Sequence, residues 1–478
     1  MNVYFHTFGC KANQYDTELV RQAFTDRGAV AVDDPAAADL AVVNSCTVTH
    51  ESEAKLRRFV GRLARHYPRL GTVVMGCAAA RDDGAIAALP AVRAVVGGAD
   101  PAQVLRAAGL TSPPDPLSAL RRGGTADGQS FPLSTPRGGT ADSQSFPLST
   151  RRGGTADSQS FPLSTQWRGG QGVRSRGWLK IQDGCDEHCT FCATTIARGA
   201  NRSRSIPELV QEAQALAQHH AEIVLTGVHI GTYGQDRAAD PGRKPGVDTR
   251  PETSGWGDPR AGARGQSTLG DLLEALIQAV PQVRFRLSSI EATEVDDTIA
   301  RLLIEAPRNL AAHLHAPLQA GSDRVLKRMG RHWYTAASYR SRIEWLAERL
   351  PVFGLGADII AGFPGETDAD HGATLALVAA LPFTYLHVFP FSARPGTAAT
   401  RLGAPLPPRV VRERARELRA LGEAKARAHR GRRLGQRADG VVSGRGEGKL
   451  EVLTEDYLSV YLPIADWNGR PRFDIMVR

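Results

Sequence analysis

Cysteine is the residue type in this chain whose spacing points most directly to chemistry. Only six cysteines occur among 478 residues, and Cys185, Cys189 and Cys192 lie together in the segment CDEHCTFC. Three thiolates this close can hold three irons of a [4Fe–4S] cube, and no fourth cysteine lies nearby. The fourth iron would then keep an open position, as catalytic metal sites do. The spacing therefore predicts a catalytic cluster site at these three cysteines.

An open iron of this kind predicts radical chemistry. S-adenosylmethionine (SAM) can chelate it through its amino and carboxylate groups, and an electron from the cluster then breaks a C–S bond to release a 5′-deoxyadenosyl radical. The alternative is a zinc knuckle, which would need a fourth Cys or His at short spacing. His188 lies inside the segment and is a rival ligand, but a loop histidine beside a metal site is more often a bystander.

The other three cysteines have no local metal-binding spacing but share a position in the predicted fold. Cys10, Cys46 and Cys77 each closely follow an apolar run that is typical of a parallel strand, namely Val3–Phe8, Leu40–Val43 and Thr72–Met75. The carboxyl ends of parallel strands lie along one edge of an open α/β sheet, where ligands bind. The thiols are expected to converge there and to hold a second cluster with an open iron. The alternative is three buried structural cysteines.

The three strands and their cysteines lie in an N-terminal segment that a linker follows. Residues 1–110 alternate strands with helical stretches at Asp16–Arg27 and Glu51–His66, and a fourth strand is expected at Val92–Val96. Such alternation predicts an open parallel α/β domain. Residues 111–172 follow as a linker, in which residues 121–165 repeat a 15-residue polar unit three times. The unit is too short and polar to stack as a solenoid, so we expect disorder without chemistry.

Residues 173–408 alternate strand and helix again, around a Gly/Pro/Arg-rich insert at 236–266. Strands are expected at Trp178–Gln182, Ile223–Val228, Arg284–Ser288, His313–Leu318, Gly356–Ile360 and Leu386–Phe389, with helices such as Ile206–His219, Leu269–Ala279 and Ala336–Arg349 between them. Six βα units predict a partial (β/α)6 barrel, whose active site lies at the carboxyl ends of the strands. The polar candidates for SAM binding there are Gly227, His229, Ser289, Glu291, Gln319, Ser322 and Asp358, and each has an ordinary loop residue as its alternative.

The last segment, 409–478, is first basic and then β-rich. Eleven Lys or Arg stand against three Glu between Arg409 and Arg437, within a chain of net charge +9. Short strands are expected at Gly440–Val442, Lys449–Leu453, Leu458–Leu462 and Phe473–Val477. No run of eighteen apolar residues and no signal-peptide pattern occurs, so we expect a cytoplasmic protein without a membrane partner.

Several motifs together resemble one family. The segments GCKANQYDTE, NSCTVT, MGC, DGCDEHCTFC and ARGANRSRS are similar to those of the radical SAM methylthiotransferases. The resemblance covers nearly the whole chain except the two insertions. It implies an N-terminal three-cysteine domain, a radical SAM partial barrel and a small all-β TRAM barrel that binds RNA. The segments EIVLTGVHIGTYGQD, RLSSIE, HLHAPLQAGSDRVLKRM, ADIIAGFPGET and LTEDYL are similar to the branch that acts on N6-threonylcarbamoyladenosine in tRNA.

Small departures from that branch occur at Ala12, where Val is usual, at Thr195-Ile196, where Pro-Tyr is usual, and at Ala320, where Ser is usual. They leave the six cysteines intact and bear only on substrate detail. Arg198, Arg202 and Arg204 follow the cysteine loop and are candidates to face tRNA phosphate or a SAM carboxylate, with a solvated loop as the alternative. Tyr457, Tyr461 and Trp467 are candidates to stack on bases, although at least two are expected in the core of the small barrel.

The resemblance implies addition of a methylthio group to C2 of the modified adenosine beside the anticodon. One SAM supplies the radical that removes hydrogen, a second methylates the inserted sulfur, and the N-terminal cluster holds or supplies that sulfur. The cofactors implied are two [4Fe–4S] clusters and SAM. The partners implied are tRNA, an electron donor such as a flavodoxin or ferredoxin, and a sulfur donor that the sequence does not identify. Alternative targets are isopentenyladenosine in tRNA or an Asp of a ribosomal protein, and the non-enzyme alternative is an RNA-binding iron–sulfur protein.

Overall fold

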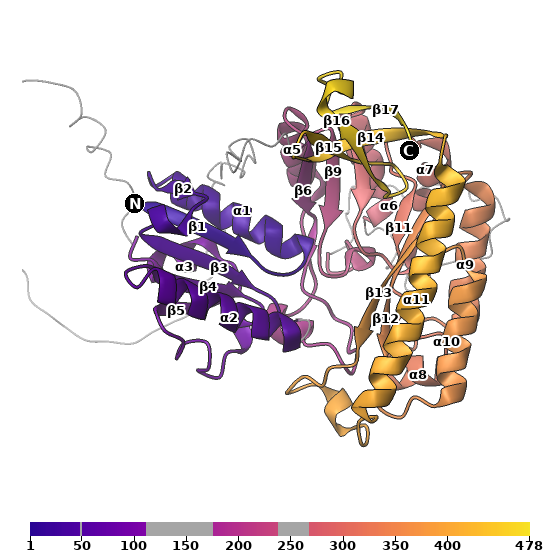
Figure 1. Ribbon diagram of the computed structural model, residues 1–478. Helices are drawn as coiled ribbons and strands as arrows, with labels where there is room; N and C mark the ends of the chain where they lie inside the picture. Colours follow the sequence, from indigo (N-terminus) through magenta and orange to yellow (C-terminus); the bar gives the residue numbers. More distant parts are fainter. Residues whose placement is uncertain (48–49, 111–174, 238–266) are drawn as a thin grey trace, which may run out of the picture.

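The computed structural model describes residues 1–47, 50–110, 175–237 and 267–478 in three successive parts (Figure 1). The repeats at 121–165 and the insert from residue 238 to 266 lie outside the described residues, so the expectations about them stay predictions. Within the described part of the chain, no helix is both long and apolar enough to cross a membrane.

The N-terminal part is a parallel sheet covered on both faces. Its strands stand in the order β2-β1-β3-β4-β5 and comprise β1 (Asn2–Thr7), β2 (Val30–Val32), β3 (Leu40–Ser45), β4 (Gly71–Gly76) and β5 (Val92–Gly97). The helices are α1 (Lys11–Thr25), α2 (His50–His66) and α3 (Pro101–Ala107), with short 3-10 turns at η1 (Pro35–Ala37) and η2 (Ala79–Arg81). Helices α1 and α3 share one apolar cluster with the sheet, and α2 shares another. The predicted open α/β domain is confirmed.

The central part is built on six parallel strands: β6 (Arg176–Lys180), β9 (Glu222–Thr226), β10 (Arg284–Leu287), β11 (His313–His315), β12 (Gly354–Ala361) and β13 (Tyr385–Pro390). They form two sheets, ordered β10-β9-β6 and β11-β12-β13. Parallel bridges from Phe285 to Leu310 and from Ser289 to His315 join the two sheets into one curved wall. The predicted six βα units are therefore present, and the short antiparallel pair β7 (Gln182–Asp183) and β8 (Arg202–Ser203) lies beside them.

Most helices of the central part cover the outside of this wall, whereas α4 (Thr194–Arg198) packs against η2 of the N-terminal part. The other helices are α5 (Ile206–Ala217), α6 (Leu269–Ala279), α7 (Asp297–Glu305), α8 (Asp323–Arg328), α9 (Ala336–Arg349) and α10 (Asp368–Ala380), with 3-10 turns η5 (Ile230–Thr232), η6 (Ala292–Glu294) and η7 (Ala398–Arg401). Threonine begins three of these helices with a capping box, at Thr268, Thr335 and Thr367, which satisfies two of the unpaired N–H groups of a helix start.

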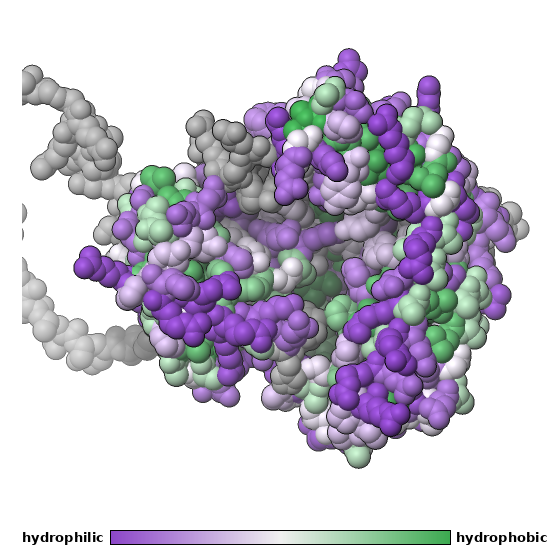
Figure 2. Space-filling model, in the orientation of Figure 1, coloured by the Kyte–Doolittle hydropathy of each residue, from purple (hydrophilic) through white to green (hydrophobic). Residues whose placement is uncertain are grey.

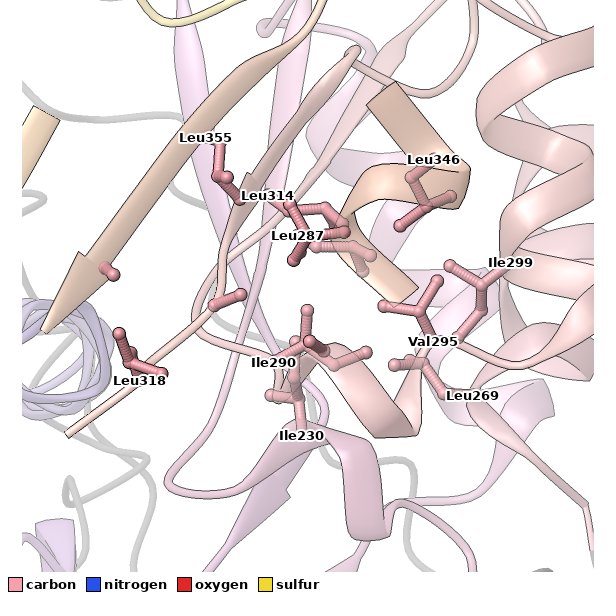
Figure 3. Packing of buried hydrophobic residues seen from close by; sticks show 14 of the residues in the cluster. Ile230, Leu269, Leu287, Ile290, Val295, Ile299, Leu314, Leu318, Leu346 and Leu355 are labelled. Carbon is pink, nitrogen blue, oxygen red and sulfur yellow. The ribbon is translucent and has the colours of Figure 1, made fainter. Parts of the chain in front are cut away.

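Along each barrel strand, apolar side chains that face the helices alternate with side chains that face the barrel interior. Leu287, Leu314 and Leu355 point outward and pack against helical residues such as Ile299 and Leu346 (Figure 3). Successive strand side chains point to opposite faces. The neighbours of these leucines therefore face the interior of the barrel, and this is where the polar side chains of the strands gather.

The C-terminal part begins with α11 (Pro408–Arg433), which runs along α10 and β13 (Figure 1). The strands β14 (Arg437–Gly446), β15 (Lys449–Leu453), β16 (Ser459–Pro463) and β17 (Arg472–Met476) follow, with η8 (Ile464–Asp466) between the last two. They form an antiparallel sheet in the order β16-β15-β14-β17. Within the described residues this is an open sheet with β16 and β17 at its edges, whereas a closed small barrel was expected.

Several basic side chains of helix α11 are bound within the protein, although the composition suggested an exposed basic surface. Arg414 is buried and pairs with Glu366 at 2.8 Å, and Arg433 is buried and pairs with Glu455 at 2.7 Å. Lys425 donates to the carbonyl oxygen of Leu381. Several of the eleven basic residues therefore hold the helix to the barrel and the sheet, and only the remainder is available to an anionic partner.

Candidate active site

The core triad, Cys185, Cys189 and Cys192, lies on the loop between β7 and α4. Gly184 starts this loop at φ +71°, and a Cβ there would lie 1.8 Å from the carbonyl oxygen of Ala200, so only glycine fits. All three cysteines are free and partly buried. Their sulfurs are therefore fixed at the carboxyl ends of the strands, where the sequence placed them.

Each sulfur of the core triad has a polar neighbour. The Cys185 sulfur lies 3.6 Å from Nδ1 of His229, and the Cys189 sulfur accepts from Nη1 of Arg331 at 3.3 Å. The Cys192 sulfur accepts from the backbone N–H of Thr194, also at 3.3 Å. Burial raises the pKa of the Cys189 thiol to about 12, although the Arg331 cation opposes this shift. A bound metal cluster would compensate the negative charge of such buried thiolates.

Glu291 and His229 lie beside this loop, as the sequence predicted for residues at the strand ends. The Glu291 carboxylate is buried and binds both Arg331 and Nε1 of Trp333. Nε2 of His229 lies 2.7 Å from the Glu294 carboxylate. Burial alone would lower the pKa of His229, but the Glu294 carboxylate raises it well above its usual value. Glu291 thus positions Arg331 beside the Cys189 sulfur, whereas His229 itself lies beside the Cys185 sulfur. Arg331 is a contributor that sequence reasoning missed.

The other predicted SAM contacts line neighbouring strand ends. A Cβ on Gly227 would lie 2.8 Å from both oxygens of Gln182, which accepts from the backbone N–H of His229 at 2.9 Å. Ser289 forms a bridge with His315, and Gln319 has a φ of +62° and exchanges backbone hydrogen bonds with β12. Ser322 instead donates to Asp370 at 2.6 Å, at the start of α10. Its side chain therefore supports a helix packed outside the barrel.

The N-terminal triad, Cys10, Cys46 and Cys77, gathers at the carboxyl edge of the first sheet. Oδ1 of Asn13 lies 3.6 Å from the Cys10 sulfur and 4.0 Å from the Cys77 sulfur. The Cys46 sulfur is 3.0 Å from where a Cβ of Gly9 would stand, and Gly9 has a φ of +106°. The predicted convergence of three thiols is therefore present, around a glycine and an asparagine.

Both triads have a donor set that suits an iron–sulfur cluster. All six cysteines are free, so none is lost to a disulfide. Among the described residues, neither triad brings its three sulfurs within 4.8 Å of one another, the spacing that one metal ion would require. His188 is exposed. Three thiols without a fourth cysteine fit a cube of four irons with one open position better than a closed zinc site.

Arg198 links the helix that follows the core triad to the N-terminal triad. Its Nε donates to the Cys77 sulfur at 3.2 Å, while its terminal nitrogens reach Asn13 at 2.7 Å, Asp16 at 2.9 Å and Asp183 at 2.9 Å. Because α4 begins directly after Cys192, the side chain spans from the core loop to the N-terminal triad. Asp16 and Asp183 also share Lys180, at 2.7 Å each.

The prediction that Arg198, Arg202 and Arg204 face tRNA or SAM needs correction. Arg204 pairs with Glu212 at 2.7 Å and donates to the hydroxyl of Tyr15, so it joins the N-terminal domain to the barrel as Arg198 does. Only Arg202 has a largely exposed side chain. The sequence identified cationic residues but not their partners, which come from a distant segment.

Aromatic and imidazole side chains form the interior wall of the barrel. The Asp358 carboxylate accepts from Nε2 of His315 at 3.0 Å and lies 3.2 Å from Nδ1 of His387. Burial opposes ionisation of Asp358, but the two histidines lower its pKa below the usual range. The Tyr385 hydroxyl bonds both His315, at 3.0 Å, and His313, at 2.9 Å. Asp358 is thus fixed within a hydrogen-bonded network.

Tyr457 enters this wall from the C-terminal sheet. Its ring stacks on His313 with centroids 4.4 Å apart, and its backbone φ of +71° is uncommon for a residue with a Cβ. Trp467 packs against the small apolar core, whereas Tyr461 is 61% exposed. The expectation that at least two of the three aromatic residues fill that core is therefore wrong.

Lys11 lies next to Tyr457, with Nζ 5.9 Å from the ring centroid. Burial, with the cations Arg176 and Arg286 nearby, lowers its pKa to about 8. Figure 2 shows a hollow between the N-terminal domain and the barrel, bordered by hydrophilic side chains. The two triads offer one site for radical generation and a separate site for a second cluster.

Comparisons with known proteins agree with this arrangement. Residues 2–97 match the model of uncharacterized protein family UPF0004, and residues 179–378 match that of the radical SAM superfamily. The threonylcarbamoyladenosine tRNA methylthiotransferase MtaB of Bacillus subtilis (strain 168) is 33% identical over 89% of this chain and 81% of its own. Its namesake in Thermotoga maritima is 32% identical over 93% of this chain and 89% of its own.

A second group of relatives carries another name. The tRNA-2-methylthio-N(6)-dimethylallyladenosine synthase of Sorangium cellulosum is 33% identical over 92% of this chain and 81% of its own. Among solved structures, the radical S-adenosylmethionine methyltransferase TsrM from Kitasatospora setae, with cobalamin and a [4Fe-4S] cluster bound, aligns at a TM-score of 0.50 and 13% identity, over 83% of this chain and 76% of that chain. That likeness concerns the fold alone.

Proposed function

This chain belongs to the radical SAM tRNA methylthiotransferase family, and on that premise we propose that it adds a methylthio group to C2 of N6-threonylcarbamoyladenosine beside the anticodon of tRNA. One observation carries the proposal: the chain holds two separate cysteine triads, and Arg198, which follows the core triad on α4, contacts the Cys77 sulfur of the N-terminal triad. The substrate follows from relatives named for it, which match nearly the full chain.

The six cysteines carry distinct tasks in this proposal. Cys185, Cys189 and Cys192 hold the cluster at which SAM binds, and Cys10, Cys46 and Cys77 hold the second. When bound, these groups supply the electron and the radical that removes hydrogen from C2, and a site for sulfur from an external donor. Gly227, His229, Ser289, Glu291, Gln319 and Asp358 are proposed to line the SAM pocket.

The protein's own contribution is to fix charge and position. Arg331 places a cation on the Cys189 sulfur, and Glu291 and Tyr334 hold its guanidinium in place. Arg198 likewise places its guanidinium beside the Cys77 sulfur. Both arginines favour the thiolate form of a buried cysteine, which is the form that binds metal.

In the same proposal, each segment of the chain has its own role. Residues 1–110 form the sulfur-handling domain, 111–172 a linker, 173–408 the radical SAM core and 409–478 a TRAM-like tRNA-binding part. Exposed Arg437, Arg445, Lys449 and Tyr461 lie on the C-terminal sheet. Basic and aromatic side chains of this kind suit phosphate contact and base stacking.

A second substrate, isopentenyladenosine in tRNA, has specific support. One relative named for dimethylallyladenosine is 33% identical to this chain, the same identity as one named for threonylcarbamoyladenosine. Both reactions would use the same triads, so the triads do not distinguish them.

The test is a side-by-side reaction. Anaerobically reconstituted protein is incubated with SAM, dithionite, a sulfide source and tRNA carrying either modification, and the nucleosides are analysed by mass spectrometry. The proposal predicts methylthio product on threonylcarbamoyladenosine and little on isopentenyladenosine. The reverse preference would contradict the substrate assignment. The absence of 5′-deoxyadenosine with either tRNA would contradict the enzyme assignment.

A further inference from the structure

Lys11 is a cation without a counter-ion in the interior of the site. It is the first residue of α1, directly after Cys10, and its side chain is only partly exposed. Its Nζ lies 5.9 Å from the ring centroid of Tyr457, and the carboxylate of Glu222 attracts it without forming an ion pair. Among the residues that the structure describes, Lys11 makes no hydrogen bond and no ion pair.

The other cations of this region are all bound. Arg176, Arg284 and Arg286 share the buried carboxylate of Glu222 at 2.6, 2.7 and 2.9 Å. Lys180 and Arg198 share Asp16 and Asp183. A charged group removed from water is unfavourable unless it is paired. Lys11 therefore stands out as the cation that is ready to receive an anion.

Tyr457 keeps Lys11 at the interior of the barrel. Its ring packs between His313 and the guanidinium of Arg286, whose carbon lies 5.3 Å from the ring centroid. The uncommon positive φ of Tyr457 is maintained by these contacts. An ammonium beside a fixed aromatic ring, and one residue from a proposed cluster ligand, is directed at what binds between the triads rather than at the outer surface.

The chemistry of the proposed substrate identifies the anion. The threonylcarbamoyl group on N6 ends in a carboxylate, whereas an isopentenyl group is neutral. N6 and the reacting C2 flank N1 on the same edge of the adenine ring. A substrate with C2 presented to the cluster held by Cys10 would therefore bring its carboxylate towards the residue next to Cys10.

We propose that Lys11 binds the threonyl carboxylate and so selects threonylcarbamoyladenosine over adenosines with a neutral N6 substituent. This inference rests on the proposed function. Lys11 acts as a specificity-determining residue, with Tyr457 as its positioning partner. Two other anions compete for the same ammonium: the negative charge of the cluster bound by Cys10 and a phosphate of the tRNA.

A substrate pair separates these anions. Anticodon stem-loop RNA is prepared with threonylcarbamoyladenosine and with its methyl ester, which lacks only the negative charge. Both RNAs are assayed with the wild type, Lys11→Met, Lys11→Arg and the control Lys55→Met, which removes the same charge from an exposed position on α2. Iron content and the visible spectrum are recorded for each protein.

A charge-assisted hydrogen bond of ordinary strength predicts a loss of about 10- to 100-fold in kcat/KM when Lys11→Met acts on the carboxylate substrate. The wild type should lose a similar factor when the substrate is esterified. The variant should then show no further loss, because the two changes remove one shared interaction. Lys11→Arg should recover most of the activity, and Lys55→Met should behave as the wild type.

Three outcomes decide between the explanations. Equal losses for Lys11→Met on the acid and the ester would overturn the inference in favour of the cluster or a phosphate. Wild-type protein that uses acid and ester equally well would also overturn it, without relying on any variant. Wild-type protein that yields no methylthio product from the acid substrate, but does so from isopentenyladenosine, would contradict the proposed function itself.

Discussion

Glu222 offers the sharpest test of how the barrel is held to the C-terminal sheet. Its carboxylate is fully buried at the start of β9 and accepts from Arg176, Arg284 and Arg286. Arg284 also donates to the carbonyl oxygens of Asp439 and Leu453 in the C-terminal sheet. The substitution Glu222→Gln keeps the shape but removes the one charge that these guanidiniums share.

The magnitude follows from burial. Removing one partner of a buried ion pair typically costs about 3–5 kcal/mol, because the remaining charge is left uncompensated. Arg284 and Arg286 are both completely buried, whereas Arg176 is partly exposed. At about 2–4 °C per kcal/mol for a domain of this size, Tm should fall by about 6–20 °C. Exposed Glu274, paired with Arg301, is the control, and Glu274→Gln should cost about 1 kcal/mol or less.

The pH dependence gives a second readout. Burial opposes ionisation of Glu222, but Arg286, Arg284 and Arg176 lower its pKa well below the usual 4.5. A carboxylate whose folded-state pKa is depressed stabilises the fold above its unfolded-state pKa, and this contribution is lost as the pH falls through the folded-state value. The gap in Tm between wild type and Glu222→Gln should therefore be full near neutral pH and narrow below about 4.5. Equal Tm values for Glu222→Gln and Glu274→Gln at neutral pH would refute this account.

Three further predictions follow from the site and the linkers. Changing the core triad, Cys185, Cys189 and Cys192, to Ala should remove about four of about eight irons and end 5′-deoxyadenosine formation. By contrast, Cys10→Ala, Cys46→Ala or Cys77→Ala should spare SAM cleavage and stop methylthiolation. Full methylthio product from these single variants would make the second cluster dispensable. Deleting residues 121–165 should leave Tm and activity nearly unchanged, since loop-closure entropy changes slowly with length, and loss of soluble expression would show that the repeats are structural. Changing exposed Arg437, Arg445 and Lys449 to Gln should flatten the salt dependence of tRNA binding, measured as log affinity against log salt, by roughly 0.7–0.9 per lost phosphate contact. An unchanged slope would mean that tRNA is bound elsewhere.

The strands of the fold could be predicted from sequence because buried parallel strands are continuous apolar runs. Leu40–Val43 falls within β3, and Val92–Val96 falls within β5. Strand β2 (Val30–Val32) was missed although its residues are all apolar, because the run is short and lies at the sheet edge, where Val30 is 56% exposed. Helix α1 begins five residues before the expected Asp16, because its N-cap, Cys10, lacks the capping side chain that marks a helix start.

The site was only partly predictable for a related reason. The positions of all six cysteines could be predicted, because each follows a strand that the local sequence marks. The partners of Arg198 were not predictable, because Cys77 and Asp16 lie 121 and 182 residues away along the chain. Tyr457 could be recognised as an aromatic residue but not as part of the barrel wall, because its place depends on how the C-terminal sheet docks.

The central claim is that this chain methylthiolates threonylcarbamoyladenosine in tRNA. Nucleoside mass spectrometry of tRNA from a deletion strain, with and without the gene restored, tests it most directly. The account predicts that the methylthio form of threonylcarbamoyladenosine disappears on deletion, while its unmethylthiolated precursor accumulates. Restoring the wild-type gene should return the product, and a gene encoding Cys185→Ala should not. Retention of the product in the deletion strain, or loss of methylthio-isopentenyladenosine in its place, would contradict the claim.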